Sequence, residues 1–215
     1  MPKENTAPER EMCPGCPYRA PLAAMNRLWL RACSGGGCSY LGGMRPFMAV
    51  EEAAGAGKAV SALSRRLAAG AKRTELIALL PASEIDAAAL DELKSCGGIA
   101  LAVGPQSPAW LCAGADTAFA EASAFDTAAI AAALRSALSG ADAAVVYCRG
   151  ECAKKAAPGG AKFKIAGDYC RRCGACSRLG CPAITASRPP VIDAGRCAGC
   201  GVCAQLCPCG AIREA

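Results

Sequence analysis

Apolar and polar positions between residues 50 and 148 alternate between two kinds of pattern. Short apolar runs predict buried strands over residues 75–80, 98–103 and 142–147. Amphipathic stretches predict helices over residues 50–67, from a capping box at Ser83 and Asp86 to about Lys94, and from an N-cap at Asp126 to about Leu138. Strands that alternate with helices of this length are typical of βαβ units. The pattern therefore predicts an α/β domain with a mostly parallel sheet.

The other segments set the expected domain boundaries. Residues 1–12 are polar and are expected to form a disordered lead-in, and residues 22–30 have helical apolar spacing. Residues 33–43 are rich in glycine, which suits either close approach to a ligand or a flexible linker. Residues 153–167 predict a second linker. We therefore expect one domain over residues 13–152 and another over residues 168–215, with Cys96 and Cys112 as small buried side chains of the first.

Cysteines in two matching runs organise the second domain. Each run has three cysteines spaced C-x2-C-x2-C and a fourth that directly precedes proline, at Cys181 and Cys207. This is the spacing of bacterial ferredoxins with two [4Fe–4S] clusters, in which the fourth cysteine of each run binds the other run's cluster. A tight loop presents three thiolates to three irons, whereas the fourth iron faces away and needs a remote ligand. The two runs also align as an internal repeat, with Ile184 and Ile212 in matching places.

Crossed ligation assigns each cluster four cysteines. We call them the first quartet, Cys170, Cys173, Cys176 and Cys207, and the second quartet, Cys181, Cys197, Cys200 and Cys203. Paired C-x2-C motifs also suit tetrahedral zinc, but zinc ribbons do not place three thiolates in one small loop. The spacing therefore favours two [4Fe–4S] clusters over zinc and leaves Cys209 without a role.

Composition narrows the classes of function. The chain has 17 cysteines, no histidine, no apolar run long enough to span a bilayer and no signal-peptide core. We therefore expect reduced thiols in a cytoplasm, and the lack of histidine excludes Rieske-type clusters, haem ligation by histidine and histidine-based catalysis. Clusters that each carry about −2 would offset the net charge of +6. Nucleic-acid binding is thus not expected, and Arg171, Arg172, Lys154 and Lys155 are interpreted as counter-charges or partner-docking residues.

Four motifs occur in the order of a known family. They are CPGCPYR from residue 13, GGGCSYLGG from residue 35, VVYCRGEC from residue 145 and CRRCGACSRLGCPAI from residue 170. Together they resemble the C-terminal half of the alpha subunit of indolepyruvate:ferredoxin oxidoreductase, and more broadly the thiamine-diphosphate-binding part of 2-oxoacid:ferredoxin oxidoreductases. The resemblance covers nearly the whole chain from residue 13. It implies a sheet of the thiamine-diphosphate-binding type followed by a small α+β ferredoxin domain.

The resemblance also implies a third cluster. Relatives with a cluster beside thiamine hold it with an early C-x2-C, a cysteine in a glycine-rich turn and a late cysteine after a strand. The matching positions here are Cys13, Cys16, Cys38 and Cys152. The spacing of Cys13, Cys16, Cys33 and Cys38 is also like that of a zinc ribbon. We expect a third [4Fe–4S] cluster on the first of these sets, with zinc or no metal as the alternatives.

The family's magnesium site is missing from this sequence. Family members bind thiamine diphosphate through Mg²⁺, held by an aspartate after one strand and an asparagine after the next, and Mg²⁺ needs such oxygen ligands. Here the two strands end in LPAS (residues 80–83) and GPQS (residues 104–107), and Glu84 and Asp86 are expected in the following helix. We therefore expect a degenerate domain that has lost thiamine diphosphate and has no catalytic residue.

Three functional hypotheses follow. The first is an electron-transfer protein or subunit that passes single electrons between a partner oxidoreductase subunit and a ferredoxin-like acceptor. The second is an active thiamine-dependent oxidoreductase subunit that is completed by a partner chain. The third is a zinc-stabilised scaffold without a redox role.

Overall fold

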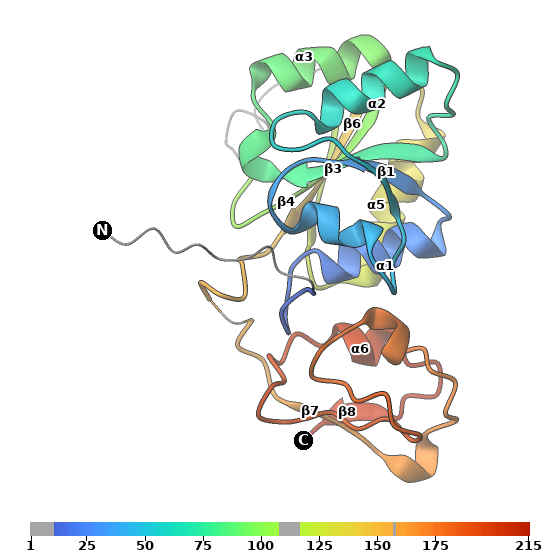
Figure 1. The fold of residues 1–215 in the computed structure, drawn as a ribbon, viewed down its shortest axis with the longest axis vertical. Helices are drawn as coiled ribbons and strands as arrows, with labels where there is room; N and C mark the ends of the chain where they lie inside the picture. Colours follow the sequence, from blue (N-terminus) through green and yellow to red (C-terminus); the bar gives the residue numbers. More distant parts are fainter. Residues whose placement is uncertain (1–10, 108–116, 157) are drawn as a thin grey trace.

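The computed structural model describes residues 11–107, 117–156 and 158–215. It consists of an N-terminal α/β unit and a smaller C-terminal cysteine-rich unit (Figure 1). The α/β unit contains a six-stranded sheet of order β2-β1-β3-β4-β6-β5, in which neighbouring strands are parallel. Its strands are β1 (Arg31–Ser34), β2 (Val50–Ala53), β3 (Leu76–Pro81), β4 (Ile99–Gly104), β5 (Ala118–Ser123) and β6 (Ala144–Arg149). The predicted α/β class with a parallel sheet is confirmed.

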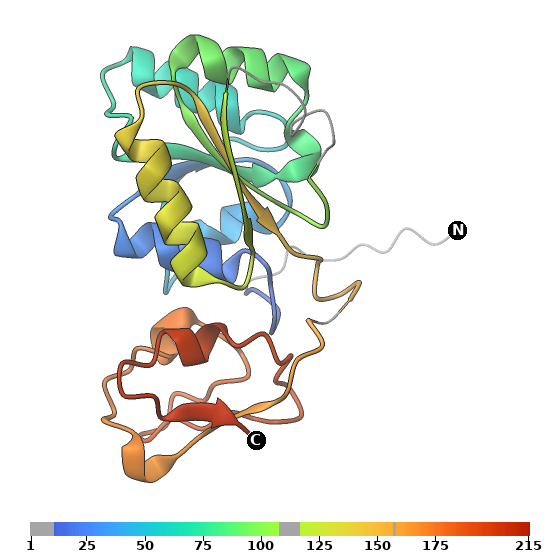
Figure 2. The same cartoon turned by 180° about the vertical axis from the view of Figure 1, so that it is seen from behind.

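Helices cover both faces of this sheet. Helices α1 (Arg19–Arg27) and α5 (Thr127–Ser139) pack on one face, and α2 (Ala59–Ala68) and α3 (Ala87–Cys96) pack on the other (Figures 1 and 2). Successive strand residues point to opposite faces, so Leu79 joins the core under α1 and Leu80 joins the core under α2 and α3. The three central strands β3, β4 and β6 are buried over nearly their whole length. Their apolar runs made them predictable from the sequence.

Two edge strands were missed, and one of them was predicted as helix. The predicted helix 50–67 is wrong at its start, because β2 occupies Val50–Ala53 and α2 begins only at Ala59. Gly55 lies between them with a φ of 90°, a conformation that ends regular structure at that point. The edge strand β5 has only one strand neighbour and is mostly exposed, so it lacks the apolar run that marks a buried strand.

Several predicted boundaries also need correction. Helix α1 begins at Arg19, three residues before the predicted start, and the N-cap of α3 is Asp86 rather than Ser83. Asp86 accepts a hydrogen bond from the Ala89 N–H at 2.8 Å. Met12 was assigned to a disordered lead-in but is buried in the core, whereas residues 1–10 lie outside the described residues. Cys96 is only partly buried at the end of α3, and Cys112 lies outside the described residues.

The C-terminal unit begins inside the segment predicted as a linker. Strand β7 (Phe163–Ile165) pairs antiparallel with β8 (Ile212–Glu214), so the first and last parts of this unit are held side by side. Between them lie the short 3-10 helices η3 (Gly167–Tyr169) and η4 (Ser177–Leu179) and the helix α6 (Val202–Gln205). The predicted linker 153–167 therefore ends at residue 162. The unit lies beneath α1 and α5 in both views (Figures 1 and 2).

Gln205 joins the two units through the N-terminus of α5. Its Oε1 accepts hydrogen bonds from the Thr127 N–H at 2.8 Å and the Thr127 hydroxyl at 2.9 Å. Its Nε2 donates to the Phe125 carbonyl at 2.6 Å. The first N–H groups of a helix have no partner within the helix, so a side chain from another unit can satisfy them. The cysteine-rich unit thus provides a hydrogen-bond acceptor for the N-terminus of α5.

We expect Gln205→Ala to lower the free energy of unfolding by about 1 kcal/mol, since water can replace part of the lost bonding at this exposed side chain. Gln205→Glu keeps the acceptor for Thr127 and loses only the bond to Phe125, so it should cost less. Urea unfolding of the anaerobic full-length chain measures both effects. Equal stability of all three proteins would contradict this role.

Candidate metal centres

The first quartet lines one small cavity. Cys170, Cys173 and Cys176 come from the loop between η3 and η4, and Cys207 follows α6 in the second run. The cavity measures about 20 Å³, and Ile165 and Ile212 close its apolar side. Cys209 also lines it, with its Sγ 3.6 Å from the Cys207 Sγ. The fold therefore brings the remote fourth cysteine of the second run to the loop of the first run.

The second quartet lines a matching cavity. Cys197, Cys200 and Cys203 come from the second loop and the start of α6, and Cys181 comes from the first run. This cavity also measures about 20 Å³, and Ile184 and Ile192 lie in its wall. The two runs thus exchange their fourth cysteines, since Cys181 joins the second quartet and Cys207 joins the first. Ile184 and Ile212 occupy equivalent walls, one in each cavity.

Backbone N–H groups are directed at the cysteine sulfurs. The Ala211 N–H donates to the Cys207 Sγ at 3.3 Å. The N–H groups of Ser177, Val202 and Ala204 interact in the same way with Cys176, Cys200 and Cys203. Such bonds favour thiolates and help to set the reduction potential of an iron–sulfur cluster. Both quartets therefore have the surroundings that thiolate ligands need.

Burial opposes ionisation of these thiols when no metal is bound. It raises the pKa of Cys203 to about 12 and also raises the pKa of Cys176 and Cys200 above the ordinary thiol value. Only the thiolate binds iron, so cluster assembly must release these protons and is favoured at higher pH. The thiolate forms of these cysteines are therefore disfavoured unless a bound cation offsets their negative charge.

The N-terminal cysteines occupy a tight turn. The Cys16 N–H donates to the Cys13 carbonyl at 3.1 Å, with Pro14 and Gly15 between them and a Gly15 φ of 75°, as in a type II turn. The side chains of Cys16 and Cys38 are in hydrogen-bond contact. This hydrogen bond and burial both raise the pKa of Cys16. Cys38 lies in the 3-10 helix η1 (Gly37–Gly43), directly after β1. The structure therefore joins the C-x2-C turn to the glycine-rich loop.

Cys152 approaches this turn from the carboxyl end of β6. A side chain at Gly150, two residues before Cys152, would lie 3.1 Å from the Pro17 Cβ, directly after Cys16. The late segment and the early turn are thus neighbours. Cys33 points to the opposite face of the sheet and packs in the core under α2. The alternative zinc set, which requires Cys33 with Cys13, Cys16 and Cys38, is not assembled.

The same turn lies against the second quartet. Gly15 lines the cavity of that quartet, and a side chain at this position would come 2.7 Å from the Ala198 Cβ. Ala198 sits between Cys197 and Cys200. The N-terminal turn therefore adjoins the second quartet, and no residue of this turn lines the cavity of the first quartet.

Glu84 was wrongly predicted to belong to the helix after β3. It ends the 3-10 helix η2 (Ala82–Glu84) and turns back to the glycine-rich loop, where its Oε1 accepts the Gly36 N–H at 2.9 Å. Gly35 and Gly36 leave room for the carboxylate, since a Cβ on either would overlap it. Its Oε2 is buried without a hydrogen-bond partner among the described residues. Nothing in the local sequence signalled this contact, because it depends on the pairing of β1 with β3.

The cysteines of the quartets are not arranged around a single metal ion. A tetrahedral zinc ion holds its four sulfurs about 3.8 Å apart, given Zn–S bonds of about 2.3 Å. Over the ranges 11–107, 117–156 and 158–215, no group of three His, Cys, Asp or Glu side chains is placed to share a metal ion. Each quartet instead lines a cavity of about 20 Å³.

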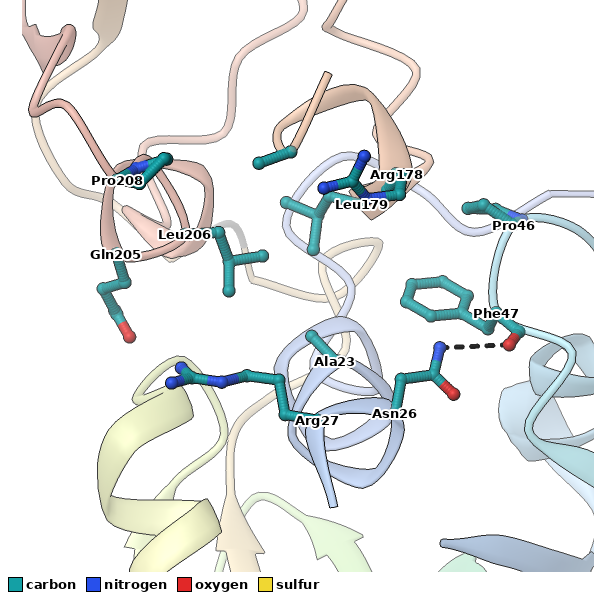
Figure 3. A pocket seen from close by; sticks show the side chains of 11 residues that line it. Ala23, Asn26, Arg27, Pro46, Phe47, Arg178, Leu179, Gln205, Leu206 and Pro208 are labelled. Atoms are coloured by element: carbon teal, nitrogen blue, oxygen red, sulfur yellow. Dashed lines mark hydrogen bonds between the residues drawn. The ribbon is translucent and has the colours of Figure 1, made fainter. Parts of the chain in front are cut away.

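A larger groove of about 470 Å³ runs between the two units (Figure 3). Figure 3 shows Arg27 and Asn26 of α1 on one side and Leu206 and Pro208, which flank Cys207, on the other. No cysteine lines it, so it is separate from the candidate metal centres.

Among the described residues, no helix has the length and apolar character to span a membrane.

Comparison with known proteins identifies an iron–sulfur domain in the C-terminal unit. Residues 190–213 match the family described as 4Fe-4S binding domain, a segment that contains the whole second run. A stretch of 56 residues is 43% identical to the indolepyruvate oxidoreductase subunit IorA of Methanothermobacter thermautotrophicus. It covers 25% of this chain and only 9% of that protein. The resemblance to this alpha subunit is thus confirmed over a short stretch, and the C-terminal unit contains a 4Fe-4S binding domain.

Proposed function

We propose that this chain is an iron–sulfur electron-transfer protein or subunit of a 2-oxoacid:ferredoxin oxidoreductase-like system, with indolepyruvate as the 2-oxoacid of that system. The observation that carries this proposal is the pair of crossed cysteine quartets around matching cavities. When bound there, [4Fe–4S] clusters accept and release single electrons. The chain's residues hold the clusters, direct N–H groups at their ligands and keep water away with isoleucine side chains.

The order of the sites supports transfer through the chain. The N-terminal cysteine turn packs against the loop of the second quartet, and each quartet takes its fourth cysteine from the run of the other. Cys173 of the first quartet is exposed, and Arg171 and Arg172 beside it are also exposed. A partner can therefore approach the first quartet, and a negatively charged redox protein suits these arginines. We infer a third cluster on Cys13, Cys16, Cys38 and Cys152 at the other end.

Purification without oxygen, in a reducing buffer like the cytoplasm expected for these thiols, tests this function. We expect about eight iron atoms per chain for two clusters and about twelve for three, with equal amounts of sulfide. Reduction should give paramagnetic signals that spin quantification assigns to the same number of clusters. A colourless protein that contains stoichiometric zinc and no iron would refute electron transfer and support the scaffold.

Glu84 favours a second candidate function, an active thiamine-dependent subunit completed by a partner chain. Its carboxylate lies between the carboxyl ends of β1 and β3, where the strand order β2-β1-β3 reverses direction and ligands of open α/β sheets bind. The described loops that directly follow β3 and β4, residues 82–86 and 105–107, otherwise supply no acidic side chain except Asp86, which caps α3. We expect titration with thiamine diphosphate and Mg²⁺ to give no binding. Stoichiometric binding that is lost in Glu84→Gln would establish the second function instead.

A further inference from the structure

Arg19 is a charged side chain that is buried between the two units. It starts α1, three residues after Cys16, and is only 1% exposed. Its Nη1 donates to the Leu179 carbonyl at 2.6 Å, and its Nη2 donates to the carbonyls of Met12 at 2.8 Å and Cys13 at 3.0 Å. One guanidinium thus holds the N-terminal cysteine turn and the segment that leads into Cys181.

The positive charge of Arg19 has no carboxylate partner within the described residues, where the ion pairs lie elsewhere. Its Nε is buried and makes no hydrogen bond in that part of the chain. Glu11 lines a cavity beside Arg19 but is exposed and forms no ion pair with it there. A buried charge without a counter-charge costs several kcal/mol, so the fold would be expected to avoid it.

Negative charge from the candidate clusters would resolve this imbalance. The turn of Cys13 and Cys16 lies on one side of Arg19, and Gly180, next to Cys181, lies on the other. The guanidinium therefore sits between two sites that would each hold a negative cluster.

We propose that Arg19 is a positioning residue that acts as the buried counter-charge of the second-quartet cluster and of the cluster at the N-terminal turn, and that it raises their reduction potentials. This inference rests on the proposed function. Reduction adds one electron to a cluster, and a fixed positive charge in a low-dielectric interface stabilises the reduced form. None of the carbonyls that Arg19 binds belongs to a residue that lines the cavity of the first quartet, so the potential of that cluster should change less.

Two substitutions separate charge from mechanical support. Arg19→Gln removes the charge and keeps amide donors for the carbonyls, whereas Arg19→Lys keeps the charge and loses the fork that spans three carbonyls. The matched control is Arg73→Gln. Arg73 also binds only backbone carbonyls, including those of Gly97 and Ala137, but it does so at the amino ends of the strands, far from the quartets.

Redox titration followed by paramagnetic resonance measures the potentials in the anaerobic full-length protein. In Arg19→Gln we expect the one-electron equilibrium of the second-quartet cluster to shift at least tenfold toward the oxidised form, which is about 59 mV. Arg19→Lys should stay within about threefold of the wild type on the same scale. Arg73→Gln should leave every potential unchanged.

Each outcome decides the inference. Loss of iron in Arg19→Gln with retention in Arg19→Lys would support the counter-charge, because both variants lose the guanidinium fork but only Arg19→Lys keeps the positive charge. Equal shifts in both variants, loss of iron in both, or unchanged potentials in Arg19→Gln would overturn it and leave a purely structural clamp. A wild-type protein without iron would refute the proposed function, which is a different result.

Discussion

Cys207→Ser is expected to remove about four iron atoms per chain, those of the first quartet, and to leave the second quartet loaded. Cys207 is the only cysteine of this quartet that comes from the second run, and its sulfur completes the cavity around Cys170. A serine hydroxyl is a harder and less acidic ligand than a thiol, so the fourth iron loses its bond. Iron analysis and spin quantification after anaerobic purification measure the loss.

Paired variants test whether the ligands are crossed. If they are, Cys207→Ser combined with Cys170→Ser removes about four irons, because both residues bind one cluster. Cys207→Ser combined with Cys197→Ser removes about eight, because the residues then bind different clusters. Uncrossed runs would give the reverse counts, and that result would contradict the assignment of both quartets.

Cys209 needs its own control in this experiment. Its sulfur lies 3.6 Å from that of Cys207, close enough to replace it as a ligand. An N–H from Arg171 lowers the pKa of Cys209, which favours its thiolate. The Cys207 variants are therefore made in a Cys209→Ser background. Cys209→Ser alone should keep all of its iron, since Cys207 has the Ala211 N–H that supports a bound thiolate.

The features that could be predicted from the sequence are those that depend on residues close together in the chain. Buried strands such as β4 are apolar over their whole length, and the cysteine runs carry their spacing in the sequence itself. The edge strand β2 was predicted as helix because Glu51 and Glu52 give it no alternating apolar face. Those glutamates pair with Arg65 and Arg66 of α2 in the folded chain. A long-range pairing of this kind leaves no local signal.

Two side chains near the candidate centres could not be predicted for the same reason. Glu84 was interpreted as a helix residue, yet it meets Gly36 only because β1 and β3 are neighbours in the sheet. Arg19 follows the C-x2-C motif directly, but its burial depends on docking of the unit that contains Leu179. The candidate ligands of the quartets could therefore be identified from the sequence. The residues that affect their surroundings could be identified only from the tertiary structure.

Replacement of Cys38 by serine is expected to lower the iron content from about twelve to about eight atoms per chain, if the N-terminal turn holds the third cluster. The side chains of Cys38 and Cys16 are in contact, so loss of this thiol removes a ligand from the centre of the site. Both quartets should keep their clusters, because neither cavity is lined by Cys38. The remaining signals should therefore be those of the two C-terminal clusters.

Cys33→Ala is the matched control, because it distinguishes iron–sulfur from zinc at the same turn. Cys33 has the spacing of a zinc-ribbon ligand, but its side chain packs under α2 on the face opposite Cys16 and Cys38. We therefore expect Cys33→Ala to keep about twelve irons while Cys38→Ser loses about four. If each variant instead lost one zinc ion and no iron, the turn would be a zinc site. Electron transfer would then begin at the second quartet, whose cavity Gly15 already lines.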